Sequence, residues 1–193
     1  MKVGGSLACT PRVTSYAPRC ALLAGLVAAL LAASAAGAAF AADNLLNKNA
    51  PEFAIRDLDG RTVNLAAFRG KVVLLNFWAT WCAPCQVEMP VFAAWQRQYA
   101  PRGFQVIGIS MDDDPAPARH LVERLKLNYP VAMGDERLGA RYGGVLGLPL
   151  TFLIDRNGVV RARFQGETDV KVIEIRVRAL LAQPRPQEKS HAR

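Results

Sequence analysis

In this 193-residue chain, Cys82 and Cys85 are separated by two residues, and this is the spacing in the sequence that is best suited to chemistry. If both lie on one helix, the second thiol is one turn from the first and close enough to bond to it. A loop that short removes little entropy from the unfolded chain, so a purely stabilising disulfide is a poor explanation. The spacing instead indicates a pair that forms and opens its disulfide during thiol–disulfide exchange.

The pair follows a segment where a buried strand is expected to end and a helix to begin. Lys71–Trp78 is a nearly continuous apolar run, typical of a central strand covered on both faces. The first turn of a helix carries free N–H groups and the positive end of the helix dipole, which stabilise an anion. Pro84 falls in this turn, where its missing N–H costs little. We therefore expect Cys82 to be an exposed attacking thiolate and Cys85 a shielded thiol that resolves the mixed disulfide.

Zinc binding and peroxide reduction are the alternative chemistries for such a pair. A structural zinc site needs about four ligands, but the sequence holds no second Cys-x-x-Cys and its only histidines are His120 and His191. A peroxidase with one peroxidatic cysteine fits the same architecture, yet it does not explain a second thiol one helical turn away. We expect neither a metal nor another cofactor.

The flanking sequence predicts the elements that hold this junction. Phe53–Arg56 and Arg61–Leu65 flank an Asp-Gly step, which is typical of a β-hairpin. Gln86–Tyr99 predicts a helix that Pro90 interrupts with a kink, because proline lacks the N–H and its ring crowds the preceding turn. Phe104–Met111 predicts a second buried strand.

The second half of the chain predicts a further helix, a hairpin and a last helix. Three acids open the first of these, over about Ala116–Leu127. Leu150–Asp155 and Val159–Phe164 predict two strands joined by a turn. The segment from Val170 fits a strand or a helical face, and its length favours a helix with Thr168 as the cap. The predicted order contains connections that run from a strand through a helix to the next strand, and these require a mixed sheet between layers of helices.

The first 42 residues differ in composition from the rest of the chain. Three basic residues and no acid precede an uncharged run from Cys20 to Ala42, in which 12 of 23 residues are alanine. This pattern indicates an export signal, with Ala-x-Ala cleavage sites at residues 36–38 and 39–41, and we favour it over an uncleaved membrane anchor of the same length. Both interpretations place residues 43–183 outside the cytoplasm. We expect residues 184–193 to form a disordered charged tail.

Removal of the leader changes what the composition means. The remaining residues are enough for one domain with a sizeable core, and their only cysteines are Cys82 and Cys85. Without the three basic residues of the leader, the net charge of +8 falls to +5, which is spread thinly, with no basic stripe interleaved with aromatic residues, so we expect no nucleic-acid partner. No segment after Ala42 stays uncharged for the length of a membrane span, so membrane contact is expected only through the N-terminal segment.

Two segments resemble the thioredoxin superfamily: residues 72–90, VVLLNFWATWCAPCQVEMP, and residues 144–160, GVLGLPLTFLIDRNGVV. Within it, the chain is most similar to the TlpA/ResA-like exported thiol–disulfide oxidoreductases, which include cytochrome c maturation reductases of the CcmG/DsbE type. The likeness extends over Asn47–Ala182. It implies an α/β fold, a thioredoxin-like three-layer α/β/α sandwich with a mixed central sheet and an N-terminal β-hairpin.

The resemblance also implies roles for residues around the dithiol. Pro149 matches the proline that these proteins hold in the cis form, and the backbone of Leu148 would pair with a substrate segment as an added strand. Glu88 matches the family's glutamate. Its position three residues after Cys85 would let it raise a thiol pKa or move a proton, although the position alone would also suit a solvated acid near a helix start.

Trp81 and Pro84 would belong to the surface that contacts the client, whereas Trp78 is expected in the core. Asn76 stands where cytoplasmic thioredoxins carry a buried aspartate, so more weight falls on Glu88. Leu150 replaces a polar residue that follows the proline in many relatives, which predicts a more apolar contact surface.

The resemblance implies an exported reductant of protein disulfides. Electrons would arrive from a membrane dithiol transporter of the DsbD/CcdA kind and leave to a client such as apocytochrome c. The Ala-Pro dipeptide and the helix dipole do not by themselves set the redox potential. Two alternatives stay open, a module that binds clients without turnover and a structural protein with a permanent bridge.

Overall fold

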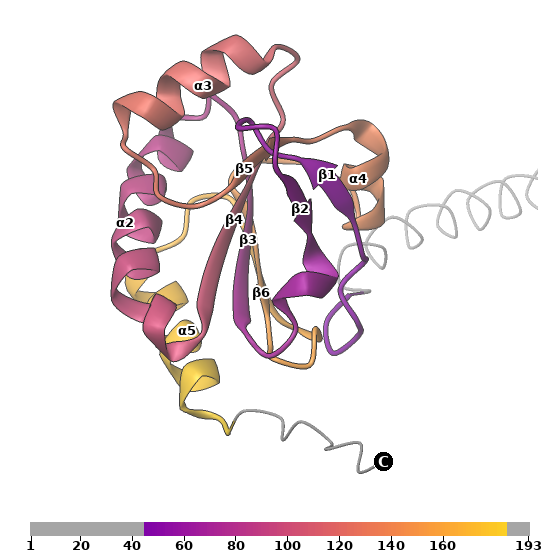
Figure 1. The fold of residues 1–193 in the computed structure, drawn as a ribbon, viewed down its shortest axis with the longest axis vertical. Coiled ribbons are helices and arrows are strands. Elements are labelled where there is room, and N and C mark those ends of the chain that lie inside the picture. Colours follow the sequence, from indigo (N-terminus) through magenta and orange to yellow (C-terminus); the bar gives the residue numbers. More distant parts are fainter. Residues whose placement is uncertain (1–44, 185–193) are drawn as a thin grey trace, which may run out of the picture. The chain divides into compact units, whose positions relative to one another are not determined.

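The computed structural model describes residues 45–184, and a five-stranded mixed sheet forms their middle layer (Figure 1). The strand order is β5-β4-β3-β6-β7. β3 (Val72–Trp78), β4 (Phe104–Ser110) and β5 (Val131–Met133) run parallel, whereas β6 (Leu150–Ile154) is antiparallel to both of its neighbours, β3 and β7 (Val160–Gln165). All seven residues of β3 are buried, as its apolar sequence predicts for a central strand.

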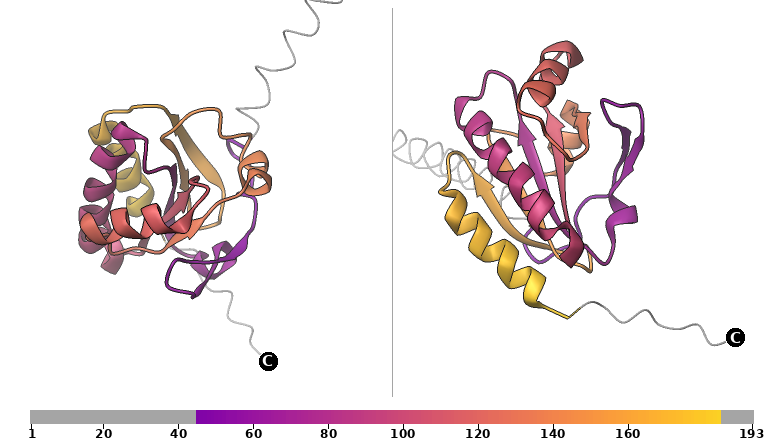
Figure 2. Two further views of the ribbon diagram at one scale, coloured as in Figure 1. Left: turned by 90° about the horizontal axis from the view of Figure 1, so that it is seen from above. Right: turned by 60° about the vertical axis from the view of Figure 1, so that its left-hand side comes forward.

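Three helices cover one face of the sheet (Figure 2). They are α2 (Ala83–Tyr99), α3 (Pro115–Arg124) and α5 (Val170–Ala182), and the 3₁₀ turn η2 (Ala100–Arg102) follows α2. Apolar side chains of the helices and of β3 form one core on this side, including Leu74, Trp78, Phe92, Leu121 and Ile173.

The opposite face is covered by the N-terminal hairpin and one short helix. The hairpin strands are β1 (Ala54–Arg56) and β2 (Thr62–Asn64), followed by the 3₁₀ turn η1 (Leu65–Phe68), and the helix is α4 (Glu136–Arg141). The rings of Phe77, Tyr142 and Phe152 meet in the second core, with centroids 5.2 to 6.2 Å apart. The predicted thioredoxin-like sandwich, with its mixed sheet and N-terminal hairpin, is confirmed.

Helix α2 is longer than the predicted range of Gln86–Tyr99. It begins at Ala83, directly after Cys82, which agrees with the expected helix start at the dithiol, and it continues through Pro90 as one helix rather than being interrupted there. Met89 and Phe92 are fully buried on either side of that proline, and such packing outweighs one lost backbone hydrogen bond. The early start is important because it places Cys82 at the N-cap.

The shorter elements were predicted less well. β5 has three residues and α4 has six, too few for their periodicity to register in a sequence. The last segment is a helix, as its length indicates, but its cap is Asp169, whose carboxylate accepts the Lys171 N–H at 2.9 Å. The predicted cap, Thr168, instead donates its hydroxyl to the Gly166 carbonyl.

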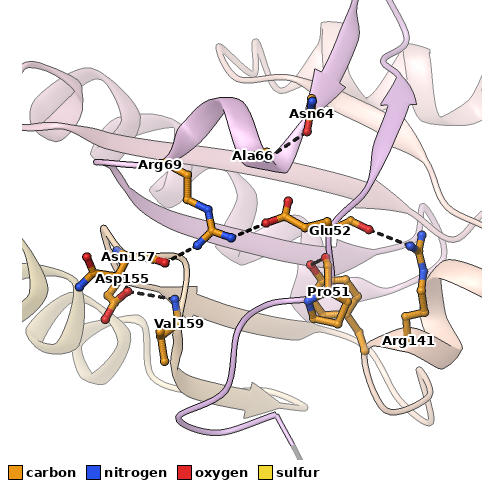
Figure 3. A network of polar contacts seen from close by, with 10 residues as sticks. Pro51, Glu52, Asn64, Ala66, Arg69, Arg141, Asp155, Asn157 and Val159 are labelled. Carbon is orange, nitrogen blue, oxygen red and sulfur yellow. Dashed lines mark hydrogen bonds and ion pairs between the residues drawn. The ribbon is translucent and has the colours of Figure 1, made fainter. Parts of the chain in front are cut away.

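The segment before the hairpin is held at the end of the sheet where β3 begins (Figure 3). Its Asn47 N–H donates to Val160, the first residue of β7. Further on, the Tyr142 hydroxyl donates to the Pro51 carbonyl at 2.8 Å, and Arg69 pairs with Glu52. Residues 47–52 therefore lie closer to the end of the sheet where β3 begins than to its last residue, Trp78.

The leader predicted over residues 1–42 and the predicted tail, apart from Pro184 itself, lie outside the described residues. Between residues 45 and 184, no helix has both the length and the apolar character needed to cross a membrane.

We expect Asp169→Ala to lower the free energy of unfolding by about 1 kcal/mol, because α5 loses the side chain that caps it. Thr168→Ala should change it by less than about 0.5 kcal/mol, since that hydroxyl caps no helix. Urea unfolding of the oxidised variants measures both changes. Equal losses from the two substitutions would contradict the assignment of the cap.

Candidate active site

Cys82 and Cys85 form a disulfide at the junction between β3 and α2. The Cys82 backbone is extended, as an N-cap requires, and its Sγ accepts the Cys85 N–H at 3.3 Å. Pro84 lies in the first turn, as predicted. A sulfur held against an unpaired N–H at a helix start is placed where a thiolate is stabilised.

The accessibility of the two sulfurs follows the expected order but not the expected degree. Cys85 is fully buried, whereas Cys82 is 5% exposed. The prediction of a well-exposed Cys82 is therefore wrong for the disulfide form, because Cys82 packs in the same apolar cluster as Cys85 and Met89. Only Cys82 offers an edge to a client.

The loop between β3 and Cys82 is fixed by a carboxylate from the neighbouring strand. Asp112 follows β4, and both of its oxygens lie 3.0 Å from the Thr80 N–H, while the Thr80 hydroxyl donates to Oδ1 at 2.7 Å. The hydroxyl of Ser110 donates to the other oxygen at 2.8 Å. This contact was not predicted from the sequence. Its signal was an acid directly after a buried strand parallel to β3, since the carboxyl ends of parallel strands meet at one edge of a sheet.

A second contact holds the carbonyl side of the same loop. The Gln86 side chain, on the first turns of α2, donates to the Thr80 carbonyl at 2.7 Å. Its Oε1 accepts from the Arg124 guanidinium at 2.8 Å, and Arg124 lies in the last turn of α3. Both backbone polar groups of Thr80 are thus engaged by side chains from other elements.

Glu88 is buried rather than solvated. It is 4% exposed and lies beyond the first turn of α2. Burial raises its pKa to about 7, the backbone of Thr168 opposes this rise, and the charge of Glu167 adds to it. Neither carboxylate oxygen has a hydrogen-bond partner of normal geometry within residues 45–184. A carboxyl with such a pKa can hold or release a proton near neutral pH.

The predicted cis bond is present between Leu148 and Pro149. Leu150, the next residue, pairs with Phe77 of β3, so the cis bond lies at the same end of the sheet as Cys82. The Pro149 carbonyl accepts the Gly166 N–H at 2.8 Å. Within the described part of the chain, the N–H and carbonyl of Leu148 make no hydrogen bond, as a strand-accepting edge would require.

The surface at this end is apolar through Trp81, which was expected there, and through Val87 and Leu146, which were not. Trp81 is 73% exposed, as predicted for a contact residue, and Val87 and Leu146 are 71% and 84% exposed. Leu150 is fully buried, so the prediction that it makes the contact surface more apolar is wrong. Its side chain belongs to the core beneath β6 because it lies within the strand ladder.

Two other predicted positions are structural. Trp78 is fully buried, and Gly108 on β4 leaves room for its indole, since a Cβ there would lie 3.0 Å from Nε1. Asn76 is 1% exposed and donates to the Thr151 hydroxyl at 2.9 Å, and because its amide does not titrate it cannot relay a proton to the dithiol. No group of three His, Cys, Asp or Glu side chains that could hold a metal ion occurs among residues 45–184.

We expect Glu88 to make the free energy of unfolding depend on pH. The pKa rises from 4.5 in an unfolded chain to about 7 in the folded one, so the folded protein binds the proton more tightly. The stabilisation is complete below pH 4.5 and is lost as the pH rises through 7. Between these limits, the oxidised protein should lose on the order of 2 kcal/mol relative to Glu88→Gln.

Urea unfolding at several pH values measures this difference. Glu167→Gln is the matched control, because it removes an exposed carboxylate and should keep most of the slope. A wild-type protein with the same pH dependence as Glu88→Gln would show that Glu88 titrates normally.

Comparisons with known proteins agree with this geometry. A profile of the AhpC/TSA family matches residues 46–163. The thiol–disulfide oxidoreductase ResA of Bacillus thuringiensis is 36% identical over 129 residues, which are 67% of this chain and 75% of the relative. ResA of Geobacillus kaustophilus is 33% identical over 129 residues, 67% of this chain and 74% of the relative.

Solved structures point the same way. A putative thiol:disulfide interchange protein DsbE from Chlorobium tepidum has a TM-score of 0.66 and 33% identity, with 71% of this chain and 98% of that chain covered. A secreted thiol-disulfide isomerase from Corynebacterium glutamicum has a TM-score of 0.64 and 28% identity, with 69% and 85% covered. The chain therefore belongs to the thioredoxin-like AhpC/TSA family and is a thiol–disulfide oxidoreductase of the ResA and DsbE type.

Proposed function

We propose that Cys82 is the attacking thiol and Cys85 the resolving thiol of a dithiol that reduces protein disulfides outside the cytoplasm. The observation that supports this most is the Cys82 sulfur at the N-cap of α2, bonded to a Cys85 that is fully buried. The more accessible sulfur is also the one whose thiolate the helix start stabilises.

The exchange proceeds in two balanced steps. The Cys82 thiolate attacks one sulfur of the client disulfide, the client's S–S bond breaks, and a client thiolate leaves while a mixed disulfide forms. The Cys85 thiolate then attacks the Cys82 sulfur, which releases the second client thiolate and forms the Cys82–Cys85 bond. The client gains two electrons and two protons, and the dithiol loses them.

Glu88 is the group that accepts the proton of Cys85 in the second step. Cys85 is buried in apolar surroundings, which raise a thiol pKa, so its deprotonation needs a nearby base. Glu88 lies one helical turn further along α2, its pKa is about 7, and both of its oxygens are free of normal hydrogen bonds within the described residues. These properties suit a general base at neutral pH.

The client docks beside the cis bond. The backbone of Leu148 pairs with an extended client segment, while Trp81, Pro84 and Pro149 contact the residues that flank the client disulfide. The indole of Trp81, which is 73% exposed, adds a large apolar contact area. A client docked in this way has its disulfide beside Cys82 and can react, whereas a pure binding module would hold the client without disulfide exchange.

The location and the electron donor follow from the leader and from the relatives. Residues 1–42 act as a cleaved export signal and place the domain in the periplasm or at the outer face of the membrane. Relatives named DsbE and a secreted isomerase support this compartment. A membrane dithiol transporter of the DsbD/CcdA kind returns electrons to the dithiol, and apocytochrome c is a client during cytochrome c maturation.

We expect Cys85→Ser, expressed in an exporting cell, to accumulate mixed disulfides on Cys82, because no thiol remains to resolve them. Non-reducing gels and mass spectrometry identify the trapped clients. Cys82→Ser should trap none, and a double Cys82→Ser, Cys85→Ser variant controls for capture without a bond. Loss of the mixed disulfides in Cys85→Ser, with unchanged disulfide reduction, would overturn the assignment of roles.

If the protein reduces its clients, the Cys82–Cys85 couple should have a low reduction potential. We expect the reduction potential of the Cys82–Cys85 couple to lie below about −200 mV, far from the value of about −120 mV typical of the oxidant DsbA. Equilibration with glutathione buffers measures it. A potential near that of DsbA would exclude the reducing direction while leaving the exchange chemistry intact, and a bridge that resists dithiothreitol would indicate a structural disulfide.

A further inference from the structure

Asp112 is joined to the dithiol loop more firmly than any other side chain outside α2. Its carboxylate accepts from the Thr80 N–H and hydroxyl and from the Ser110 hydroxyl, at 2.7 to 3.0 Å. It is half-buried, and Ser110 is fully buried. Hydrogen bonds to an ionised acceptor are shorter and stronger than those between neutral groups. The position of Thr80 is therefore tied to the end of β4.

Thr80 sits in the turn that delivers Cys82 to the helix. The Cys82 N–H donates to the Ala79 carbonyl at 3.1 Å and closes this turn. The Cys82 side chain then reaches the Cys85 N–H. This contact joins the sulfur to a single N–H, so a rotation of the turn that carries Cys82 would move the sulfur away from the helix start.

We propose that Asp112 is a positioning residue for Cys82, which keeps its sulfur at the N-cap of α2 when the disulfide is open. The inference rests on the proposed role of Cys82 as the attacking thiol. In the oxidised protein, the S–S bond itself helps to hold Cys82. In the reduced protein that bond is gone, and the contacts of Thr80 are what keeps the turn in place. Asp112 acts through Thr80 and touches no reacting atom.

Removal of the Asp112 carboxylate would have opposite effects on the pKa of Cys82, depending on whether Asp112 acts through its charge or by positioning the sulfur. The charged groups on the surrounding elements include Asp113 and Asp114 beside Asp112, Glu88 on α2, Arg124 at the end of α3 and Glu167 before α5. As a nearby negative charge, Asp112 disfavours a thiolate, so its neutralisation alone would lower the pKa of Cys82. If Asp112 mainly positions the sulfur, its truncation raises that pKa, because the thiolate loses the helix start.

The test compares Asp112→Ala with Asp112→Asn in the reduced full-length protein. Both remove the charge, but an asparagine oxygen still accepts from Thr80, and its amide group can donate to Ser110. We expect Asp112→Ala to raise the pKa of Cys82 by about one unit and to slow its alkylation at pH 7 about tenfold. Asp112→Asn should stay within about 0.3 units of the wild type. The pH dependence of iodoacetamide alkylation, resolved at Cys82 by mass spectrometry, measures the pKa.

Asp113→Ala is the matched control, since it removes an exposed carboxylate next to Asp112 and should leave the pKa of Cys82 unchanged. A pKa that falls equally in Asp112→Ala and Asp112→Asn would show that only charge matters, and a pKa unchanged in both would show that Asp112 has no influence. Either result overturns the inference.

Thr80 provides a second pair of variants in case Asp112→Ala does not fold. Thr80→Val removes the hydroxyl bond to Asp112 and should raise the pKa of Cys82, whereas Thr80→Ser keeps that bond and should preserve the wild-type value. Equal values in the two variants would contradict the positioning role. The client trap with Cys85→Ser is independent of these readings, so a failure of the proposed function is distinguishable from a failure of this inference.

Discussion

The start of α2 is the constraint on which the rest of the site depends. A strand buried on both faces must end where the core ends, and the helix that follows β3 begins with N–H groups that no preceding turn can satisfy. The Cys82 sulfur occupies the N-cap and meets one of these groups. A sulfur bonded in a disulfide is a weak hydrogen-bond acceptor. A thiolate at Cys82 would accept the Cys85 N–H more strongly. The N–H groups at the start of α2 therefore favour the opening of the disulfide.

The junction between β3 and α2 lies between an apolar helix layer that buries Glu88 and a loop held by hydrogen bonds at Thr80. The helix face of the sheet is apolar and includes Cys85 and Met89, yet Glu88 is buried beside them and its pKa is about 7. Burying a carboxyl without partners is unfavourable, so the position of Glu88 carries a local cost in stability, which the proposed role in proton transfer would explain. On the loop side, Thr80 has both of its backbone polar groups engaged by Asp112 and Gln86. The site thus combines a rigid loop with a carboxyl that is free to change protonation state.

The dithiol and the segment from Asn47 to Glu52 lie toward opposite ends of the sheet. The segment from Asn47 to Glu52 is bonded to the turn between β6 and β7, at the end where β3 begins, and the Glu52 carbonyl also accepts from Arg141 of α4 (Figure 3). The dithiol and the cis bond lie at the other end, among the exposed side chains of Trp81, Val87 and Leu146. Contacts that hold the N-terminal segment therefore do not obstruct the surface that a client would use.

Local patterns in the sequence determined the dithiol, the buried strand before it and the N-terminal hairpin, because thiol spacing, an apolar run and an Asp-Gly turn act over a few residues. The motif likeness added the cis bond at Pro149, which the structure confirms. Only the tertiary structure decided that Glu88 and Leu150 are buried and that Asp112 reaches Thr80, 32 residues away in the sequence. These outcomes depend on which elements pack together, and burial and desolvation have no local signature that a single sequence could reveal.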